Sequence, residues 1–419
     1  MAERQDTDGQ PSERLLIERL GQRGDGVASG VRGPVYVAGA LPGETVLAEV
    51  QGERGRLLAV EEPSQDRVEP YCPYYGRCGG CAVQHLAIAP SLEWKRGLLV
   101  QALRERGLDA PVEPCLDAHG AGRRRVILHV RRAETGIEAG FMEPRSHRLV
   151  AIERCPVTVP ALARAPLVAR RLGAILLTAK AKPLDAQVTA SDAGLDVDLR
   201  GHGPASAPVR LALVEAAEAL DLARLSLHGD LIVERRGPTL AMGRARITPP
   251  PGGFLQATAA GEAALARLVG EGAAPARRVV DLFAGCGPFA LRLAEGAAVH
   301  AVDGHEAGLG ALTRAARATP GLKPVTTETR DLFRRPLLPA ELERFDAALF
   351  DPPRAGAEAQ ARELARSGLR RIVGVSCNAA SFARDAAILI GAGYALERVT
   401  PVDQFRHAAH VELVGVFRR

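Results

Sequence analysis

Cys377 has the residue type and the sequence surroundings of a nucleophile. It follows a short apolar run, IVGVS, and precedes a stretch with helical periodicity, SFARDAAILI, so we expect a strand to deliver it to the start of a helix. A helix N-terminus stabilises negative charge, and the thiolate is the reactive form of cysteine. A single cysteine at a strand end is more often a small buried apolar residue, so the assignment depends on its neighbours.

Two nearby segments supply groups that can exchange a proton. The segment DQFRHAAHVE carries His407, His410 and Glu412, and two histidines with a carboxylate are suited to proton transfer. The segment DPPRAG carries Asp351 and Arg354, which two successive prolines hold on a stiff loop. The alternative is that His410 and Glu412 are ordinary surface residues.

A glycine-rich turn indicates a ligand site. The motif DLFAGCG follows an apolar run, and Gly285 and Gly287 in it allow a ligand to approach the backbone closely. The next predicted strand, AVHAVD, ends at Asp303, where an acid suits the hydroxyls of a ribose. A plain tight turn is one alternative, and a dinucleotide-binding protein is another, although the full G-x-G-x-x-G pattern is absent.

The elements that must position these groups form an α/β pattern. From about residue 249 apolar runs alternate with helical stretches, which predicts a doubly wound parallel sheet, a Rossmann-like domain. Ligands of such sheets bind at the carboxyl ends of the strands. Asp303, Asp331 and Asp351 all fall on that edge in this prediction.

The rest of the chain divides into three predicted parts. Residues 1–13 are polar and read as a disordered tail, and residues 14–62 hold short strands spaced as in a small β-barrel. Residues 63–248 mix strands and helices and form an α+β central domain before the domain at 249–419. No apolar run approaches the roughly 20 residues that span a bilayer, and no secretion signal begins the chain, so we expect a soluble cytoplasmic protein.

In this order, the motifs DLFAGCG, DPPRAG, VSCN and DQFRHAAHVE resemble those of the RNA (uracil-5-)-methyltransferase family. The resemblance covers the chain from about residue 14 to its end and implies an enzyme that uses S-adenosyl-L-methionine. The chain departs from the family at Pro288 and Thr258, where Asn is usual. The resemblance also implies contacts with the cofactor, in addition to those of the loop glycines Gly285 and Gly287. They lie at Gln256, Phe283, Asp303, Asp331 and Asp351.

The expected reaction explains why these residue types occur together. Carbon 5 of uracil is a poor nucleophile, but a thiolate that adds at carbon 6 produces an enolate centred on carbon 5. That centre can take a methyl group from the cofactor, and a base must then remove the carbon-5 proton. Cys377 is the expected nucleophile and Glu412 the expected base. Asp351 is expected to position the pyrimidine edge or the cofactor, and Arg354 to neutralise nearby charge.

Three of the seven cysteines are closely spaced in a glycine-rich segment. Cys72, Cys78 and Cys81 form a Cys-x5-Cys-x2-Cys pattern, and Cys155 is a fourth candidate ligand that precedes a proline. Such a set suits either zinc or a four-iron cluster, and spacing does not choose between them. The resemblance implies a [4Fe-4S] cluster with a structural role. Residues 14–62 further resemble a TRAM domain, an RNA-binding barrel, with Arg23, Arg54 and Arg56 as its candidate RNA contacts.

RNA is the expected partner. Family members with both barrel and cluster typically act on large-subunit ribosomal RNA, so 23S rRNA is the expected substrate and a monomer the expected state. A tRNA T-loop enzyme, a non-catalytic RNA-binding protein and an iron–sulfur oxidoreductase remain as alternatives. The net charge of +5 is modest, but several arginines in the middle of the chain are candidates for phosphate contacts. They are Arg123, Arg124, Arg125, Arg131, Arg132, Arg145 and Arg148.

Overall fold

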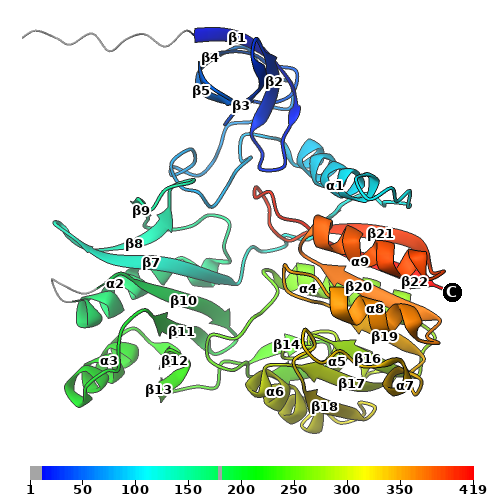
Figure 1. Cartoon of the computed structure of the whole chain (residues 1–419). Coiled ribbons are helices and arrows are strands. Elements are labelled where there is room, and N and C mark those ends of the chain that lie inside the picture. Colours follow the sequence, from blue (N-terminus) through cyan, green and yellow to red (C-terminus); the bar gives the residue numbers. More distant parts are fainter. Residues whose placement is uncertain (1–11, 178–181) are drawn as a thin grey trace, which may run out of the picture. The chain divides into compact units, whose positions relative to one another are not determined.

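The computed structural model describes residues 12–177 and 182–419, which group by their contacts into two units (Figure 1). The first unit extends to Trp94 and includes His407–Ala409, and the second comprises Lys95–Arg406 and His410–Arg419. Residues 63–94 therefore group with the barrel, whereas we predicted that residue 63 begins a central domain. The three-part division stays a prediction.

The first unit begins with a closed five-stranded barrel in the order β1-β2-β3-β5-β4. Its apolar core includes Ile17, Val37 and Val46. The predicted small barrel is confirmed. Most of the predicted tail lies outside the described residues, but Ser12 and Glu13 are strand residues that pair with β4. The strands are β1 (Ser12–Leu20), β2 (Gly26–Gly30), β3 (Gly33–Val37), β4 (Thr45–Gln51) and β5 (Arg54–Glu62).

A buried ion pair holds the barrel to the segment that follows it. The Glu44 side chain is inaccessible to solvent and accepts hydrogen bonds from Arg67 Nε at 2.6 Å and from the backbone N–H of Leu41 at 2.8 Å. Burial alone would raise the pKa of Glu44, but the bonds from Arg67, Leu41 and Ser64 lower it below its ordinary value. The cysteine-rich segment follows, and helix α1 (Ile88–Arg104) then crosses the boundary between the units.

The second unit contains a seven-stranded sheet in the order β13-β12-β11-β10-β7-β8-β9. Helix α2 (Ala165–Leu176) packs on β7 and β8, and α3 (Ala207–Ala219) packs on β12 and β13. The strands are β7 (Arg125–Ala133), β8 (Gly136–Met142), β9 (Leu149–Ala151), β10 (Leu184–Ser191), β11 (Gly194–Arg200), β12 (Leu222–Leu227) and β13 (Asp230–Glu234).

An eight-stranded sheet in the order β18-β17-β16-β19-β20-β22-β21-β6 carries the predicted motifs (Figure 1). Strands β18 to β20 are parallel, and β22 pairs antiparallel with both β20 and β21. The predicted parallel sheet of the C-terminal domain is confirmed. Its strands are β6 (Leu116–Asp117), β16 (Arg278–Leu282), β17 (Ala298–Asp303), β18 (Val325–Thr329), β19 (Ala347–Phe350), β20 (Arg371–Ser376), β21 (Ala395–Asp403) and β22 (Glu412–Arg418).

The parallel strands read as continuous apolar runs because helices cover both faces of the sheet. Val280, Leu282, Phe350 and Ile372 pack into one buried cluster, and Val279, Leu349 and Val373 pack into another. In the described part of the chain, no helix is long and apolar enough to cross a membrane. The helices are α4 (Ala259–Ala273), α5 (Ala290–Leu293), α6 (Glu306–Arg317), α7 (Pro339–Leu342), α8 (Glu358–Arg366) and α9 (Ala379–Gly391).

Candidate active site

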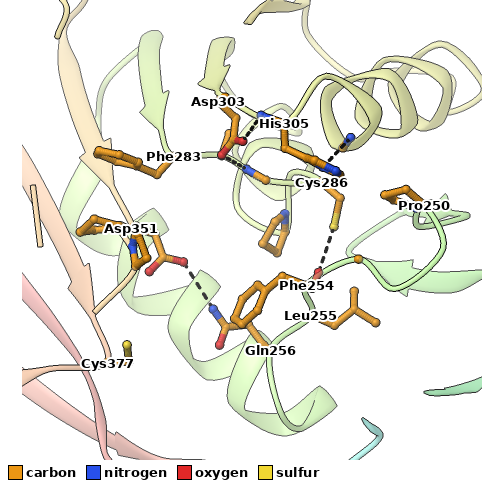
Figure 2. Close-up of a pocket in the computed structure, with 18 of the residues that line it drawn as sticks. Pro250, Phe254, Leu255, Gln256, Phe283, Cys286, Asp303, His305, Asp351 and Cys377 are labelled. Carbon is orange, nitrogen blue, oxygen red and sulfur yellow. Dashed lines mark hydrogen bonds between the residues drawn. The ribbon is translucent and has the colours of Figure 1, made fainter. Parts of the chain in front are cut away.

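A cavity of about 810 Å³ lies in the second unit, at the carboxyl ends of β16, β17, β19 and β20 (Figure 2). Parallel strands end together at one edge of a sheet, so side chains far apart in the sequence meet there. The cavity is large enough for a nucleoside-sized ligand. The predicted site residues that line it are Gln256, Phe283, Gly285, Asp303, Asp331, Asp351, Cys377 and Glu412.

The glycine-rich turn is held in place by the acid at the end of β17. Gly285 donates its backbone N–H to Asp303 Oδ2 at 3.0 Å, and Asp303 Oδ1 accepts the N–H of His305 at 2.7 Å (Figure 2). His305 in turn caps α6. Gly287 does not line the cavity; a side chain there would collide with Leu312, so packing accounts for this glycine.

Asp281, in the same motif, has no hydrogen-bond partner for either carboxyl oxygen among the described residues. It is fully buried, and burial together with the charges of Asp351 and Asp303 raises its pKa well above the ordinary value. We expect a neutral carboxyl beneath the turn. The sequence motif predicted no role for this residue.

Gln256 and Asp351 meet on one wall of the cavity. Gln256 Nε2 donates to Asp351 Oδ2 at 3.4 Å (Figure 2). Burial raises the pKa of Asp351 to about 7. Ligands that bring or remove charge will therefore change its protonation near neutral pH.

Cys377 directly follows β20 and precedes α9, as predicted, but its surroundings oppose ionisation of its thiol. Burial, followed by the charges of Glu412 and Asp351, raises its pKa to about 11, and only Arg354 among the neighbouring charges lowers it. Asn378, rather than the cysteine, accepts the first free N–H groups of α9. Burial and the two carboxyls therefore oppose the thiolate that the helix N-terminus was expected to favour, and that expectation stays a prediction.

Glu412 begins β22 and points into the same cavity. Burial and the charge of Asp351 raise its pKa to about 8, whereas a hydrogen bond from Gln404 and the charge of Arg354 lower it. A carboxyl with a pKa near neutrality is suited to general base catalysis.

The two histidines of the C-terminal motif do not act together. His410 Nε2 accepts a hydrogen bond from Arg354 Nη2 at 3.2 Å, and burial followed by the charge of Arg354 lowers the His410 pKa. His407 groups with the first unit, where its carbonyl accepts the N–H groups of Ala82 and Val83 and its ring contacts Tyr71. His407 does not line the cavity, so the prediction that it takes part in proton transfer is wrong.

Several arginines predicted to contact RNA form ion pairs within the protein. Arg124 is buried and forms an ion pair with Glu262, which also binds Arg292. On the sheet surface, Arg131 and Arg148 are paired with Glu138 and Glu143. In the barrel, Arg54 and Arg56 are paired with Asp25 and Glu49. Carboxylates on the same surface, which a count of basic residues ignores, neutralise these side chains.

Sequence reasoning missed three features of the site. Phe254 lines the cavity yet is 65% exposed, and the guanidinium of Arg125 lies 5.2 Å from the centroid of its ring. Arg200 lines the cavity from the neighbouring sheet. Gln404 is fully buried behind the cavity. The pattern of polar and apolar residues around it did not indicate that this side chain would be buried.

Of the two departures from the family pattern, Thr258 has a local explanation. Thr258 caps α4 through its hydroxyl, which accepts the N–H of Gly261 at 2.8 Å and donates to the carbonyl of Ala118 at 2.7 Å. Pro288 lines the cavity without a side-chain amide.

The cysteines of the predicted cluster fall in different units. Cys72, Cys78 and Cys81 belong to the first unit and Cys155 to the second. None of the described cysteines forms a disulfide. Over residues 12–177 and 182–419, no group of three or more His, Cys, Asp or Glu is arranged to hold a metal ion. The thiol donor set suits iron or zinc.

Comparison with solved structures agrees with the fold. The Pyrococcus abyssi tRNA (uracil-54, C5)-methyltransferase in complex with S-adenosyl-L-homocysteine aligns with a TM-score of 0.72, over 97% of this chain and 100% of that chain. The sequences are 22% identical, so the likeness shows a shared architecture.

Comparison of sequences extends the likeness to family level. The family model for tRNA (Uracil-5-)-methyltransferase matches residues 321–419. An uncharacterized RNA methyltransferase of Agrobacterium fabrum is 44% identical, over 97% of this chain and 100% of that protein. The 23S rRNA (uracil(1939)-C(5))-methyltransferase RlmD of Pseudomonas savastanoi is 35% identical, over 97% of this chain and 93% of that protein. This chain therefore belongs to the RNA (uracil-5-)-methyltransferase family.

Proposed function

We propose that this S-adenosylmethionine-dependent RNA uracil-5 methyltransferase modifies a uridine of 23S rRNA through a covalent bond to Cys377, with Glu412 as the base. The observation that carries the proposal is that Cys377, Asp351 and Glu412 reach one cavity from three separate strand ends. We further propose that the enzyme acts as a cytoplasmic monomer.

The cofactor is proposed to bind along the carboxyl edge of β16 to β19. Asp303, which already orders the glycine-rich turn, is placed to accept the ribose hydroxyls. Phe283 and Gly285 shape the wall beside it. Gln256, Asp331 and Asp351 are the remaining proposed contacts.

In the proposed reaction the Cys377 sulfur bonds to carbon 6 of uracil, and the electron pair of the ring double bond moves to carbon 5 as an enolate. Bound S-adenosylmethionine supplies an electrophilic methyl group and a positive sulfonium. Carbon 5 takes the methyl group, Glu412 removes the proton from carbon 5, and the bond between carbon 6 and sulfur breaks. Positive charge beside Cys377, such as that of Arg354, favours the thiolate that the first step requires.

Ribosomal RNA is favoured over transfer RNA by one observation. The relative from Pseudomonas savastanoi whose name specifies 23S rRNA aligns along almost the whole chain. The target uridine must leave its stack to reach a cavity at the strand ends.

The experiment transfers labelled methyl groups to RNA from cells that lack 5-methyluridine, and then separates ribosomal from transfer RNA and maps the modified base. Label at a large-subunit uridine supports the whole proposal. Label only in transfer RNA keeps the chemistry and replaces the substrate. No label in either RNA, with the cofactor still bound, favours an RNA-binding protein without activity.

A [4Fe-4S] cluster is proposed on Cys72, Cys78, Cys81 and Cys155. Anaerobically purified protein is expected to contain about four iron atoms per chain, with matching sulfide. Cys81→Ser is expected to lose the iron, whereas the control Cys286→Ser, a change outside the set, keeps it. Stoichiometric zinc in place of iron would replace this assignment.

A further inference from the structure

Gln404 occupies the centre of a hydrogen-bond network behind the cavity. It follows β21 directly and is fully buried. Its Oε1 accepts the backbone N–H of Thr258 at 3.2 Å, and its Nε2 donates to Gln256 Oε1 at 2.6 Å. The chain leaves room for it at Gly261, where a Cβ would lie 2.6 Å from the Cβ of Gln404.

The orientation of this amide follows from chemistry. A backbone N–H can only donate, so the Gln404 atom that faces Thr258 must be the oxygen. The Gln404 nitrogen must then face Gln256, and the Gln256 atom that meets it must be an oxygen. The Gln256 nitrogen is consequently the atom that faces Asp351, at 3.4 Å from Oδ2.

The Gln404 side chain also lowers the pKa of Glu412. One amide group thus connects the N-terminus of α4 with two residues that line the cavity. Gln404 itself does not line the cavity, so it acts only through these neighbours.

We propose that Gln404 is a positioning residue that sets the donor–acceptor polarity of the nucleobase site and so selects uracil over cytosine. The Gln256 oxygen is occupied by Gln404, so Gln256 offers an N–H donor to the cavity, and Asp351 offers carboxyl oxygens. Uracil presents an acceptor at O4 and a donor at N3, whereas cytosine presents a donor at N4 and an acceptor at N3. The inference rests on the proposed function of the same cavity.

Two substitutions distinguish free rotation of the Gln256 side-chain amide from a reversal of its orientation. Gln404→Met removes the donor, so the Gln256 amide becomes free to turn. Gln404→Glu keeps an acceptor for Thr258 but offers a second acceptor to Gln256, which must then turn its nitrogen inward and its oxygen toward Asp351. Discrimination against cytosine should therefore fall in both variants and further in Gln404→Glu.

The measurement compares kcat/KM for an RNA fragment with uridine at the target position and for one with cytidine there. We expect the uridine preference to fall roughly tenfold in Gln404→Met and further in Gln404→Glu. The control is Gln360→Met, because Gln360 is a buried amide that bonds only Leu337 through both its oxygen and its nitrogen. Unchanged preference in folded Gln404→Glu overturns the proposal.

A second readout uses the pH dependence of the uridine reaction. Loss of the Gln404 donor leaves Glu412 facing Asp351, Cys377 and Arg354, so the rise of kcat with pH should move to higher pH in Gln404→Met. A uniform loss of kcat at every pH, with the preference retained, would mean a merely structural role and would also overturn the proposal. Cys377→Ala, measured in parallel, tests the proposed function separately: methylation by that variant would refute the covalent mechanism.

Discussion

Cys377, Glu412 and Asp351 share one buried cavity, and the charge of Asp351 raises the pKa of both Cys377 and Glu412. Their pKa values are about 11, 8 and 7, and burial is the largest cause for each. At neutral pH the thiol is protonated and the two carboxyls are only partly ionised. Chemistry at this site therefore depends on positive charge brought by the ligands and by Arg354.

Replacement of the thiol tests the covalent step. Cys377→Ala is expected to lower methyl transfer to RNA roughly a thousandfold or more, because it removes the sulfur that is proposed to add to carbon 6. Binding of S-adenosylhomocysteine, measured by calorimetry, should remain. Cys115→Ala serves as the control, since Cys115 does not line the cavity. Turnover at the wild-type rate in Cys377→Ala would exclude the covalent mechanism.

Replacement of the base tests the last step. Glu412→Gln is expected to accumulate an RNA adduct that survives denaturing electrophoresis, because the carbon-5 proton cannot leave. Glu412 acts in its ionised form, so the wild-type rate should rise as the pH increases through about 8. Rapid product release by Glu412→Gln would assign the base elsewhere.

Among the elements, the barrel and its following segment depend on one buried carboxylate. Glu44 has a lowered pKa, so its contribution to stability is present above the pKa of the unfolded chain and is lost as the pH falls through the folded value. Glu44→Gln is expected to lower the free energy of unfolding of the first unit by about 2 kcal/mol at pH 7 and by less in acid. The exposed pair of Glu49 provides the control: Glu49→Gln should cost less than about 1 kcal/mol. Equal losses for both variants would contradict the prediction.

Helices and strands were predicted correctly from the sequence where apolar residues recur at a regular spacing. The alternation from residue 249 gave the parallel strands and placed Asp303, Asp351 and Cys377 at their carboxyl ends. The two-residue strand β6 could not be foreseen, because it exists only through pairing with β21.

At the scale of the whole molecule, the cavity belongs entirely to the second unit. Trp94, the single tryptophan of the chain, belongs to the first unit, where its Nε1 donates to the carbonyl of Gly21 at 3.2 Å. A ligand stabilises only the unit that binds it, by about 2.7 kcal/mol at a hundredfold excess over its Kd.

S-adenosylhomocysteine should therefore raise the Tm recorded by circular dichroism more than the Tm recorded by Trp94 fluorescence. Nicotinamide adenine dinucleotide is the ligand expected of the alternative function, an iron–sulfur oxidoreductase. It should raise neither of these two Tm values. Equal shifts in both signals with S-adenosylhomocysteine would show that the two units unfold as one.

The sequence alone determined the motifs, the order of the elements and the edge of the sheet at which chemistry takes place, because turn residues and apolar periodicity are local properties. The tertiary structure decided which side chains meet and how strongly they are ionised. It placed His407 in the first unit, buried Arg124 against Glu262, raised the pKa of Cys377 and put Gln404 behind the cavity. Each of these depends on burial and on contacts between distant segments, for which no local pattern in the chain provides a signal.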